Sequence, residues 1–493
     1  MDNHSKLSEH DFVNGVFQSK LSQIVTPLDK EEAWSYAKVP EHIWLALILY
    51  DGDREIQLNK SISILKELHN ITPTDQDELF TMSKIRSLSD DKKSNFTAIL
   101  KDHGVLEKLA PLSLLSGEEF HFLRSEIKTY QCSITDRVEK LNNVLGEVSD
   151  HQSQLSTDIR YLIIYQANLK SKLVVMPDSN IIDDLNNYPY LDEQDEKMRI
   201  TRPLIRSMEI GISQTFSDNS KLDNNFSPYF WGEIGRYTDC EVFSVSVSED
   251  KVDLRPIENE LYRILEYYRD VIQNLEQNDS KLFVLAGILT YSYKRVLELT
   301  EHDLQQTISG RSIVRSVVEN YMMTKYLLKN EHNHKNIWEE YQYYGIGNYK
   351  LIYERYREDS LTIDNSHVRF DYINLLTSEY INKEFLEMDT RYFGKGNIRK
   401  KFKEVDEDSL YKYLYEYDTQ FEHGLWGAIR ESSVLKCDSP GHQFHGIPDI
   451  DNVQKMPDVG NDIIKVLRKH IDVILDVYPV PFTSKEKEGG SEE

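Results

Sequence analysis

The feature that most constrains the fold is an apolar repeat with three- and four-residue steps that begins at Ile257. Residues at this spacing lie on one face of an α-helix, so the segment predicts a long amphipathic helix. Arg255-Pro256 precedes the repeat, and proline is favoured in the first turn of a helix. Similar stripes predict further helices over 281–300, 303–329, 338–356, 409–431 and 462–477.

The amino-terminal third is also predicted to be helical. The apolar run 43–50 is far shorter than the roughly 20 helical residues that cross a bilayer, so it predicts a buried helix and no membrane span. Residues 178–255 are rich in Asp, Asn and Ser and predict a linker or an irregular insertion. Within it, Phe243, Val245 and Val247 alternate with serines, which indicates at most a small β element near 241–248.

These patterns predict an all-α, multi-helix protein. We expect an amino-terminal helical region over 1–177, the linker or insertion over 178–255, a carboxy-terminal helical bundle domain over 256–480 and a disordered tail over 481–493.

Charge and cysteine content narrow the function classes. The 58 basic and 83 acidic side chains leave a formal net charge of −25, which opposes genome-wide DNA binding. Cys132, Cys240 and Cys437 are far apart and form no C-x-x-C pair, so neither a disulfide framework nor a thiolate zinc site is expected. Because no secretory signal is visible at the start of the sequence, a cytoplasmic location is expected.

Arg311, Arg315 and Glu319 are spaced four residues apart and therefore share one face of the predicted helix over 303–329. Surface ion pairs are one interpretation. The alternative is a partly buried cluster in which the arginines present planar donors to an anion.

A second group of residues lies within one predicted helix or helix-turn and consists of Tyr413, Tyr417, Glu422, His423, Gly424, Trp426 and Arg430. The histidine is suited to proton transfer near neutral pH, but in aromatic surroundings it is more often a hydrogen-bonded core residue. Tyr417 and His423 are candidate catalytic residues together with the two arginines and Glu319.

Three segments resemble a bacterial all-helical family catalogued as a domain of unknown function. Ser309–Glu319 is similar to its Arg-x3-Glu helix, and Tyr417–Gly424 to its Tyr-x5-His-Gly segment. Pro40–Ile48 resembles an extension found in longer members. The resemblance covers roughly 256–450 and implies a toxin-like or phage-defence context, without a reaction.

A weaker similarity is to HEPN-type ribonucleases, helical and metal-independent enzymes in which an arginine and a nearby histidine cleave RNA, usually across a dimer. Arg295 and His302, with six residues between them, match that spacing as an alternative catalytic pair. In such a site imidazole takes the proton of the 2′-hydroxyl and arginine stabilises the phosphorane charge.

The densest basic segment follows Gly394. Its cations are the residues at which RNA would bind, but the slightly favoured interpretation is a solvated turn that balances the acidic stretch 404–408. They are Lys395, Arg399, Lys400, Lys401 and Lys403.

Cys437, His442 and His445 form a weak metal-like group. One thiolate and two imidazoles lack a visible fourth ligand; with a water they would make an open zinc site, but a loop with chance histidines is the favoured interpretation. We therefore expect no metal and no other cofactor.

Two function classes follow. The first is a toxin-like or antiphage-defence effector, with His423 as base or acid, Arg311 and Arg315 as phosphate clamp and Glu319 as their orienting group in a metal-independent ribonuclease. The second is a non-catalytic helical sensor or scaffold in a defence complex, or a module that binds a small anionic ligand. In either class, a protein partner or a homo-oligomer is expected.

Overall fold

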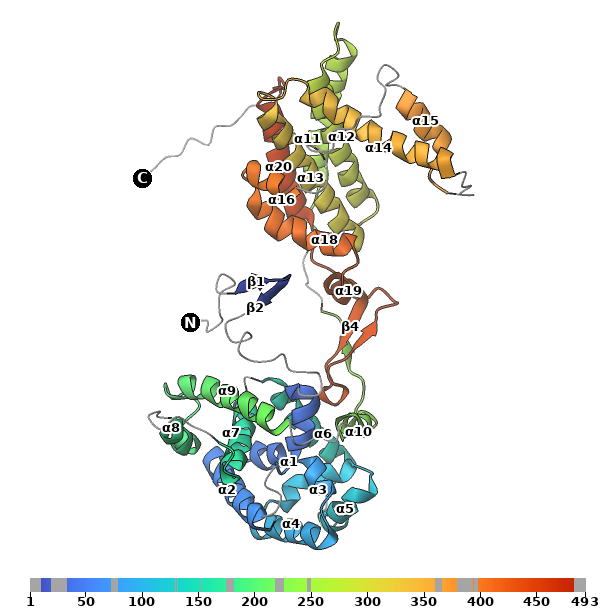
Figure 1. The fold of residues 1–493 in the computed structure, drawn as a ribbon. Coiled ribbons are helices and arrows are strands. Elements are labelled where there is room, and N and C mark those ends of the chain that lie inside the picture. Colours follow the sequence, from blue (N-terminus) through green and yellow to red (C-terminus); the bar gives the residue numbers. More distant parts are fainter. Residues whose placement is uncertain are drawn as a thin grey trace. The chain divides into compact units, whose positions relative to one another are not determined.

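The computed structural model describes residues 10–18, 33–71, 79–173, 181–217, 226–245, 250–359, 366–378, 393 and 398–482, except 129, 131 and 152. Helices dominate this part of the chain and the strands form two small sheets, which confirms the predicted all-α class with a minor β element. The chain divides into two compact units (Figure 1), Met1–Phe243 with Lys436–Ile447 and Ser244–Leu435 with Pro448–Glu493.

Helix α1 (Val39–Tyr50) lies at the centre of the first unit. All its residues except Tyr50 are buried, because its sequence is apolar around the whole circumference. This confirms the buried helix predicted over 43–50. The helices packed around it are α2 (Arg54–Ile71), α3 (Met82–Arg86), α6 (Ile134–Ser149), α7 (Gln154–Leu169) and α10 (Phe226–Gly235).

The linker or irregular insertion expected over 178–255 is largely helical instead. It contains α8 (Ile181–Asn187), α9 (Met198–Ser217) and α10, and α9 packs along α7. The apolar residues of α9 that are buried, Met198, Ile205 and Ile212, repeat at helical spacing. Because the sequence on either side of this repeat is acidic and Asn-rich, the repeat did not lead to a helix prediction. Helices α4 (Asp90–Asp102) and α5 (His121–Ile127) complete the described α-helices of this unit, and the longest of its 3-10 helices is Leu106–Leu114.

Two small antiparallel pairings account for the strands. β1 (Asp11–Val13) and β2 (Val16–Gln18) form a hairpin whose turn residues, Asn14 and Gly15, both have positive φ. β3 (Val242–Phe243), β4 (Val434–Cys437) and β5 (Gly446–Pro448) form a three-stranded sheet in that order, with Val242 opposite Cys437. The predicted β element is therefore present at 242–243, and Val247 lies outside the described residues.

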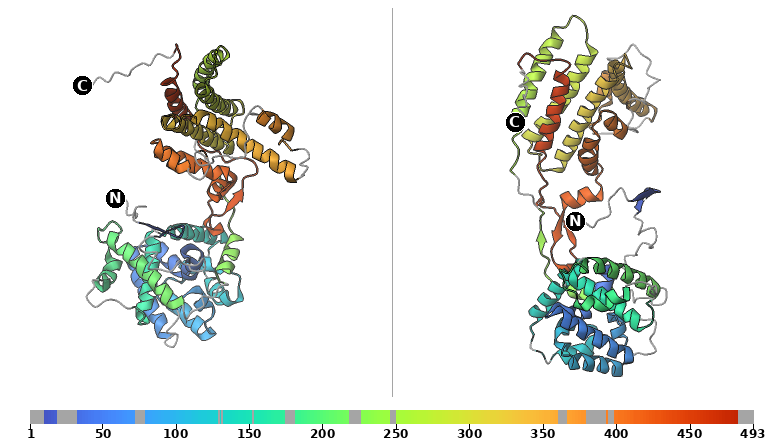
Figure 2. Two further views of the ribbon diagram at one scale, coloured as in Figure 1. Left: turned by 45° about the horizontal axis from the view of Figure 1, so that its top comes forward. Right: turned by 90° about the vertical axis from the view of Figure 1, so that its left-hand side faces the viewer.

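The second unit is built on four long helices, α11 (Arg255–Gln273), α12 (Ser280–Glu301), α13 (Ile308–Asn330) and α20 (Gly460–Leu475). Each consecutive pair packs together, and α20 lies against both α11 and α13, as Figure 2 shows in red. Asp279 caps α12 by accepting from Leu282 N at 3.0 Å, and Thr307 caps α13 by accepting from Gly310 N at 3.3 Å.

Further helices, of which the first is as long as α13, complete the described α-helices of this unit. They are α14 (Ile337–Asp359), α15 (Phe370–Ser378), α16 (Ile398–Glu404), α17 (Asp408–Leu410), α18 (Glu416–Glu422) and α19 (Trp426–Ser433). The single helix predicted over 409–431 is interrupted after α18, because Gly424 has φ +56°, the left-handed conformation that commonly ends helices.

In the part of the chain that the structure describes, no helix combines the length and the apolar character needed to span a membrane. From residue 483 onward, the predicted tail lies outside the described residues.

Candidate functional site

Helix α13 packs against α18 and against the turn of π-helix, Tyr411–Tyr415, that leads into it. Arg315 lies at this contact. Its Nη2 donates to Tyr415 Oη at 2.9 Å, and the Tyr415 hydroxyl donates to Glu319 Oε1 at 2.7 Å. Burial, together with hydrogen bonding to Glu319, raises the pKa of Tyr415 to about 12, so the hydroxyl keeps the proton that it donates.

Two carboxylates of the same unit compensate the Arg315 charge. Glu319 Oε1 lies 3.5 Å from its guanidinium and Glu422 Oε1 lies 3.9 Å away. Glu422 also accepts from the Ser312 hydroxyl at 2.7 Å, which ties the end of α18 to α13. The expected cluster of Arg315 and Glu319 therefore exists, and its partners come from about a hundred residues further along the chain.

Arg311 is more deeply buried, with 2% of its surface exposed. It donates to the backbone carbonyl oxygens of Gln305 at 3.2 Å and Pro457 at 2.7 Å. The residue before it, Gly310, lies so close to the Leu304 carbonyl that a Cβ atom there would overlap it. Arg311 is thus a link between the start of α13 and the segment before α20.

Asp418 is a member of this site that the sequence did not single out. It is 3% exposed, and its Oδ2 has no hydrogen-bond partner among the described residues. Burial raises its pKa to about 7; Arg311 and Arg315 oppose that shift, while Asp462 adds to it. In the sequence, Asp418 lies three residues after Tyr415 and three residues before Phe421. Both aromatic residues are buried, so this helical spacing could have indicated that Asp418 shares their buried face.

Tyr417 lies near Arg311, whose charge and hydrogen bonding partly oppose the rise in the tyrosine pKa. The Tyr417 hydroxyl donates to Glu431 Oε1 at 2.6 Å, and burial together with this contact raises its pKa to about 12. His423 is exposed at the end of α18. No hydrogen bond or ion pair within the described ranges joins its imidazole to Arg311 or Arg315.

The alternative pair, Arg295 and His302, is not assembled either. Arg295 forms an ion pair with Glu298, one turn along α12. His302 is exposed immediately after that helix, and within the described residues no hydrogen bond connects the two.

The basic segment is only partly available to an anion. Lys395 lies outside the described residues, and Arg399, Lys400 and Lys403 are exposed on α16. Lys401 is 5% exposed and lies over the Tyr326 ring at 5.4 Å, and burial lowers its pKa. It therefore belongs to the core rather than to an RNA-binding surface.

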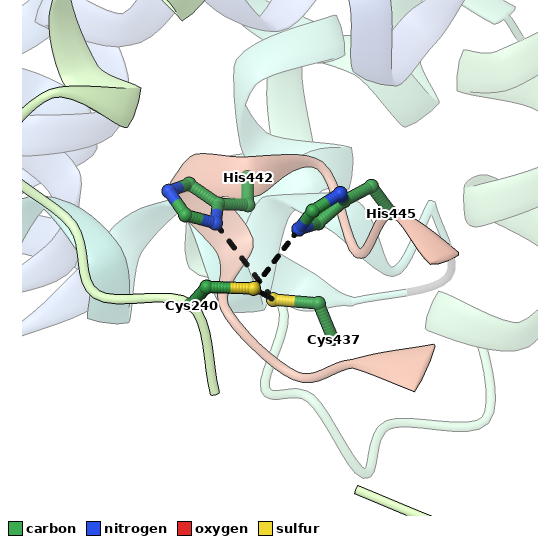
Figure 3. A group of neighbouring side chains, drawn as sticks. All are labelled: Cys240, Cys437, His442 and His445. Atoms are coloured by element: carbon green, nitrogen blue, oxygen red, sulfur yellow. Dashed lines mark hydrogen bonds between the residues drawn. The ribbon is translucent and has the colours of Figure 1, made fainter. Parts of the chain in front are cut away.

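The three metal-like residues Cys437, His442 and His445 do lie together, in the first unit, and a fourth joins them. Cys240, which precedes β3, places its Sγ 3.8 Å from that of Cys437 although 197 positions separate them. Figure 3 shows all four side chains pointing toward one centre. The expectation of no metal rested on a missing fourth ligand, and Cys240 removes that reason.

Comparison with known proteins is consistent with the helical resemblance. A family model described as a family of unknown function, DUF5677, matches residues 282–442, which include α13 and α18 but not Pro40–Ile48. No curated protein matches the chain. No solved structure matches it. Over residues 282–442, the chain is therefore similar to a family of unknown function, and these residues are largely helical here.

Proposed function

We propose that the second unit is a non-catalytic helical sensor or scaffold module that binds a protein partner. The observation that carries this proposal is that other groups of the chain already bind the guanidinium groups of both arginines in the candidate site. Arg311 is bound by two backbone carbonyl groups, and Arg315 by Tyr415 and by carboxylates. A phosphate would have to displace these partners.

The charge around the arginines also supports a structural role. Besides Asp418, four carboxylates act on this site against the positive charges of Arg311, Arg315 and Lys465, so the site is net negative even when Asp418 is protonated. Such a site repels the phosphates of RNA. These carboxylates are Glu319, Glu422, Glu431 and Asp462.

Exposed aromatic side chains of the same unit are suited to a protein partner. Tyr413 and Trp426 are 74% and 71% exposed, and aromatic residues are enriched at protein interfaces. We propose a toxin-like or antiphage-defence complex, or a homo-oligomer, as the setting, supported by the resemblance of Ser309–Glu319 and Tyr417–Gly424 to the helical family.

The test is a metal-free RNA cleavage assay paired with thermal unfolding, on wild type, Arg315→Ala and the surface control Arg269→Ala. We expect no cleavage by any of the three. Arg315→Ala is expected to lose about 1–3 kcal/mol of stability, because Tyr415 and Glu319 lose a charged partner. Among the described residues, Arg269 pairs with its exposed acidic neighbours Glu266 and Asp270, so its variant should unfold like wild type. Cleavage by wild type that Arg315→Ala abolishes at an unchanged melting temperature would overturn the proposal.

A second candidate, a metal-independent ribonuclease, is favoured by one observation. Asp418 is a buried carboxyl group whose pKa is held near 7 beside Arg311, and groups of this kind often transfer protons in active sites. In this candidate Asp418 replaces His423 as the acid or base, and the exposed cations of α16 hold the RNA. RNA cleavage whose rate follows a pKa near 7, and which Asp418→Asn abolishes, would establish it over the scaffold.

A further inference from the structure

We propose that Cys240, Cys437, His442 and His445 bind one zinc ion, and that this ion has a structural role in the first unit. All four residues belong to that unit. Their four candidate ligand atoms lie within 4.8 Å of one another.

The separations of these atoms match a tetrahedral site. With Zn–S near 2.3 Å and Zn–N near 2.0–2.1 Å, a tetrahedron places two sulfurs about 3.8 Å apart and a sulfur and a nitrogen about 3.6 Å apart. The two Sγ atoms of Cys240 and Cys437 are 3.8 Å apart. Cys240 Sγ lies 3.2 Å from His445 Nε2, and Cys437 Sγ lies 3.9 Å from His442 Nδ1. Figure 3 draws these three contacts as dashed lines.

Neighbouring groups orient the ligands. His442 Nε2 lies 3.2 Å from the Gly235 carbonyl oxygen, which favours a proton on Nε2 and leaves Nδ1 free to face the sulfurs. The backbone N–H of Ser439 donates to Cys437 Sγ at 3.4 Å, a contact that stabilises a thiolate. Groups of the protein itself thus orient two of the four ligands, His442 and Cys437.

The loop that carries the two histidines is shaped for this arrangement. Gln443 and Phe444, between them, both adopt the left-handed conformation, with φ +54° and +50°. This conformation is costly for a bulky side chain and concentrates at functional positions. Gly441 anchors the loop, because its N–H donates to Asn142 Oδ1 at 3.1 Å and a Cβ atom there would overlap Thr238.

Four protein ligands of the Cys2His2 type leave no open position for a substrate, so the site is of the structural class. Its ligands come from two places in the sequence, Cys240 beside β3 and the segment that runs from β4 to β5. Between these places the chain leaves the first unit after Phe243 and returns at Lys436. A bound ion would therefore link the segment that ends at Phe243 to the segment that begins at Lys436.

The experiment uses the full chain, purified under reducing conditions. Metal content is measured by mass spectrometry, and Co²⁺ is titrated into metal-free protein to look for thiolate-to-cobalt charge-transfer absorption. We expect about one zinc per wild-type chain and a cobalt spectrum typical of tetrahedral thiolate coordination. Stripping the zinc with a chelator is expected to lower the melting temperature, because a metal bound only by the folded state stabilises it.

Variants separate the four ligands from other cysteines and histidines. Cys240→Ser and His445→Ala each remove an exposed ligand. Removing only the hydrogen-bond partner of a ligand lowers metal affinity about 10–100-fold, so removing a ligand should weaken zinc binding at least about 100-fold. Cys132→Ser and His121→Ala are matched controls that should bind zinc like wild type. Because the cobalt titration uses wild type, it decides the question even if a ligand variant fails to fold.

Three results would overturn the proposal. The first is wild-type protein that carries no zinc and shows no charge-transfer absorption with cobalt. The second is equal metal content in the ligand variants and in the controls. The third is a disulfide between Cys240 and Cys437 in protein isolated under reducing conditions.

Discussion

Replacing Asp418 with asparagine is expected to stabilise the second unit, by an amount that grows with pH. In the folded chain, burial raises the pKa of Asp418 from an ordinary 3.8 to about 7. The folded state therefore holds this proton more tightly than the unfolded state does. Wild-type stability falls as pH rises from about 4 to about 7, and above that the full penalty of a buried charge is present. Asparagine resembles the protonated acid and carries no such penalty.

The size of the effect follows from the two pKa values. At about 1.36 kcal/mol for each pH unit, the advantage of asparagine is up to about 2 kcal/mol at pH 5.5 and up to about 4 kcal/mol at pH 8. For a unit of this size, about 2–4 °C of melting temperature accompanies each kcal/mol, so the variant should gain as much as roughly 8–16 °C at pH 8.

The assay is thermal unfolding of wild type and Asp418→Asn over pH 5.5–8.5 at constant ionic strength. Asp371→Asn is a matched control, because Asp371 is exposed and the neighbouring Arg369 lowers its pKa. A stabilisation by Asp418→Asn that does not grow with pH would refute the reasoning. So would a loss of stability at pH 8, which would mean that Arg311 and Arg315 hold the carboxylate ionised.

Two further predictions concern the cores of the two units. In the second unit, Glu407→Gln should cost about 1–3 kcal/mol at neutral pH, because Glu407 accepts from Tyr321 at 2.6 Å, Lys325 at 2.9 Å and Lys469 at 3.0 Å. Burial alone would raise the Glu407 pKa, but these three hydrogen bonds outweigh it and lower the pKa below 4.5. The stabilisation by ionised Glu407 is therefore present above pH 4.5 and is lost as the pH falls through its lowered pKa. Denaturant unfolding curves of the variant and wild type should then converge in acid. A stability difference that stays constant with pH would contradict this. In the first unit, Trp44→Ala should cost about 3–5 kcal/mol in denaturant unfolding, since Trp44 is fully buried in α1, and a loss below 1 kcal/mol would show that α1 is not the centre of that core.

Sequence alone predicted the helices whose apolar residues repeat with a helical period. Helices α11, α12, α13 and α20 lie where that repeat placed them, because the period is a local property of the chain, and α1 lies where a continuous apolar run predicted a buried helix. The long helix expected over 409–431 is divided, because a single glycine in the left-handed conformation, Gly424, ends α18.

The candidate site shows the same division between local and distant information. That Arg311, Arg315 and Glu319 share a helix face followed from their four-residue spacing. The Arg315 partners Tyr415 and Glu422 depend on how α18 and the π-helical turn before it pack against α13, which no local pattern encodes.

The cysteine and histidine cluster depended most on tertiary structure. Three of its members, Cys437, His442 and His445, are neighbours in the sequence and were recognisable as a possible metal group. The fourth, Cys240, lies 197 positions before Cys437, and only the pairing of β3 with β4 brings it to the others. Spacing along the chain determines which side chains share a helix face or a loop. Contacts across the fold depend on the packing free energy of the whole unit, and these contacts decided both the arginine network and the four-ligand cluster.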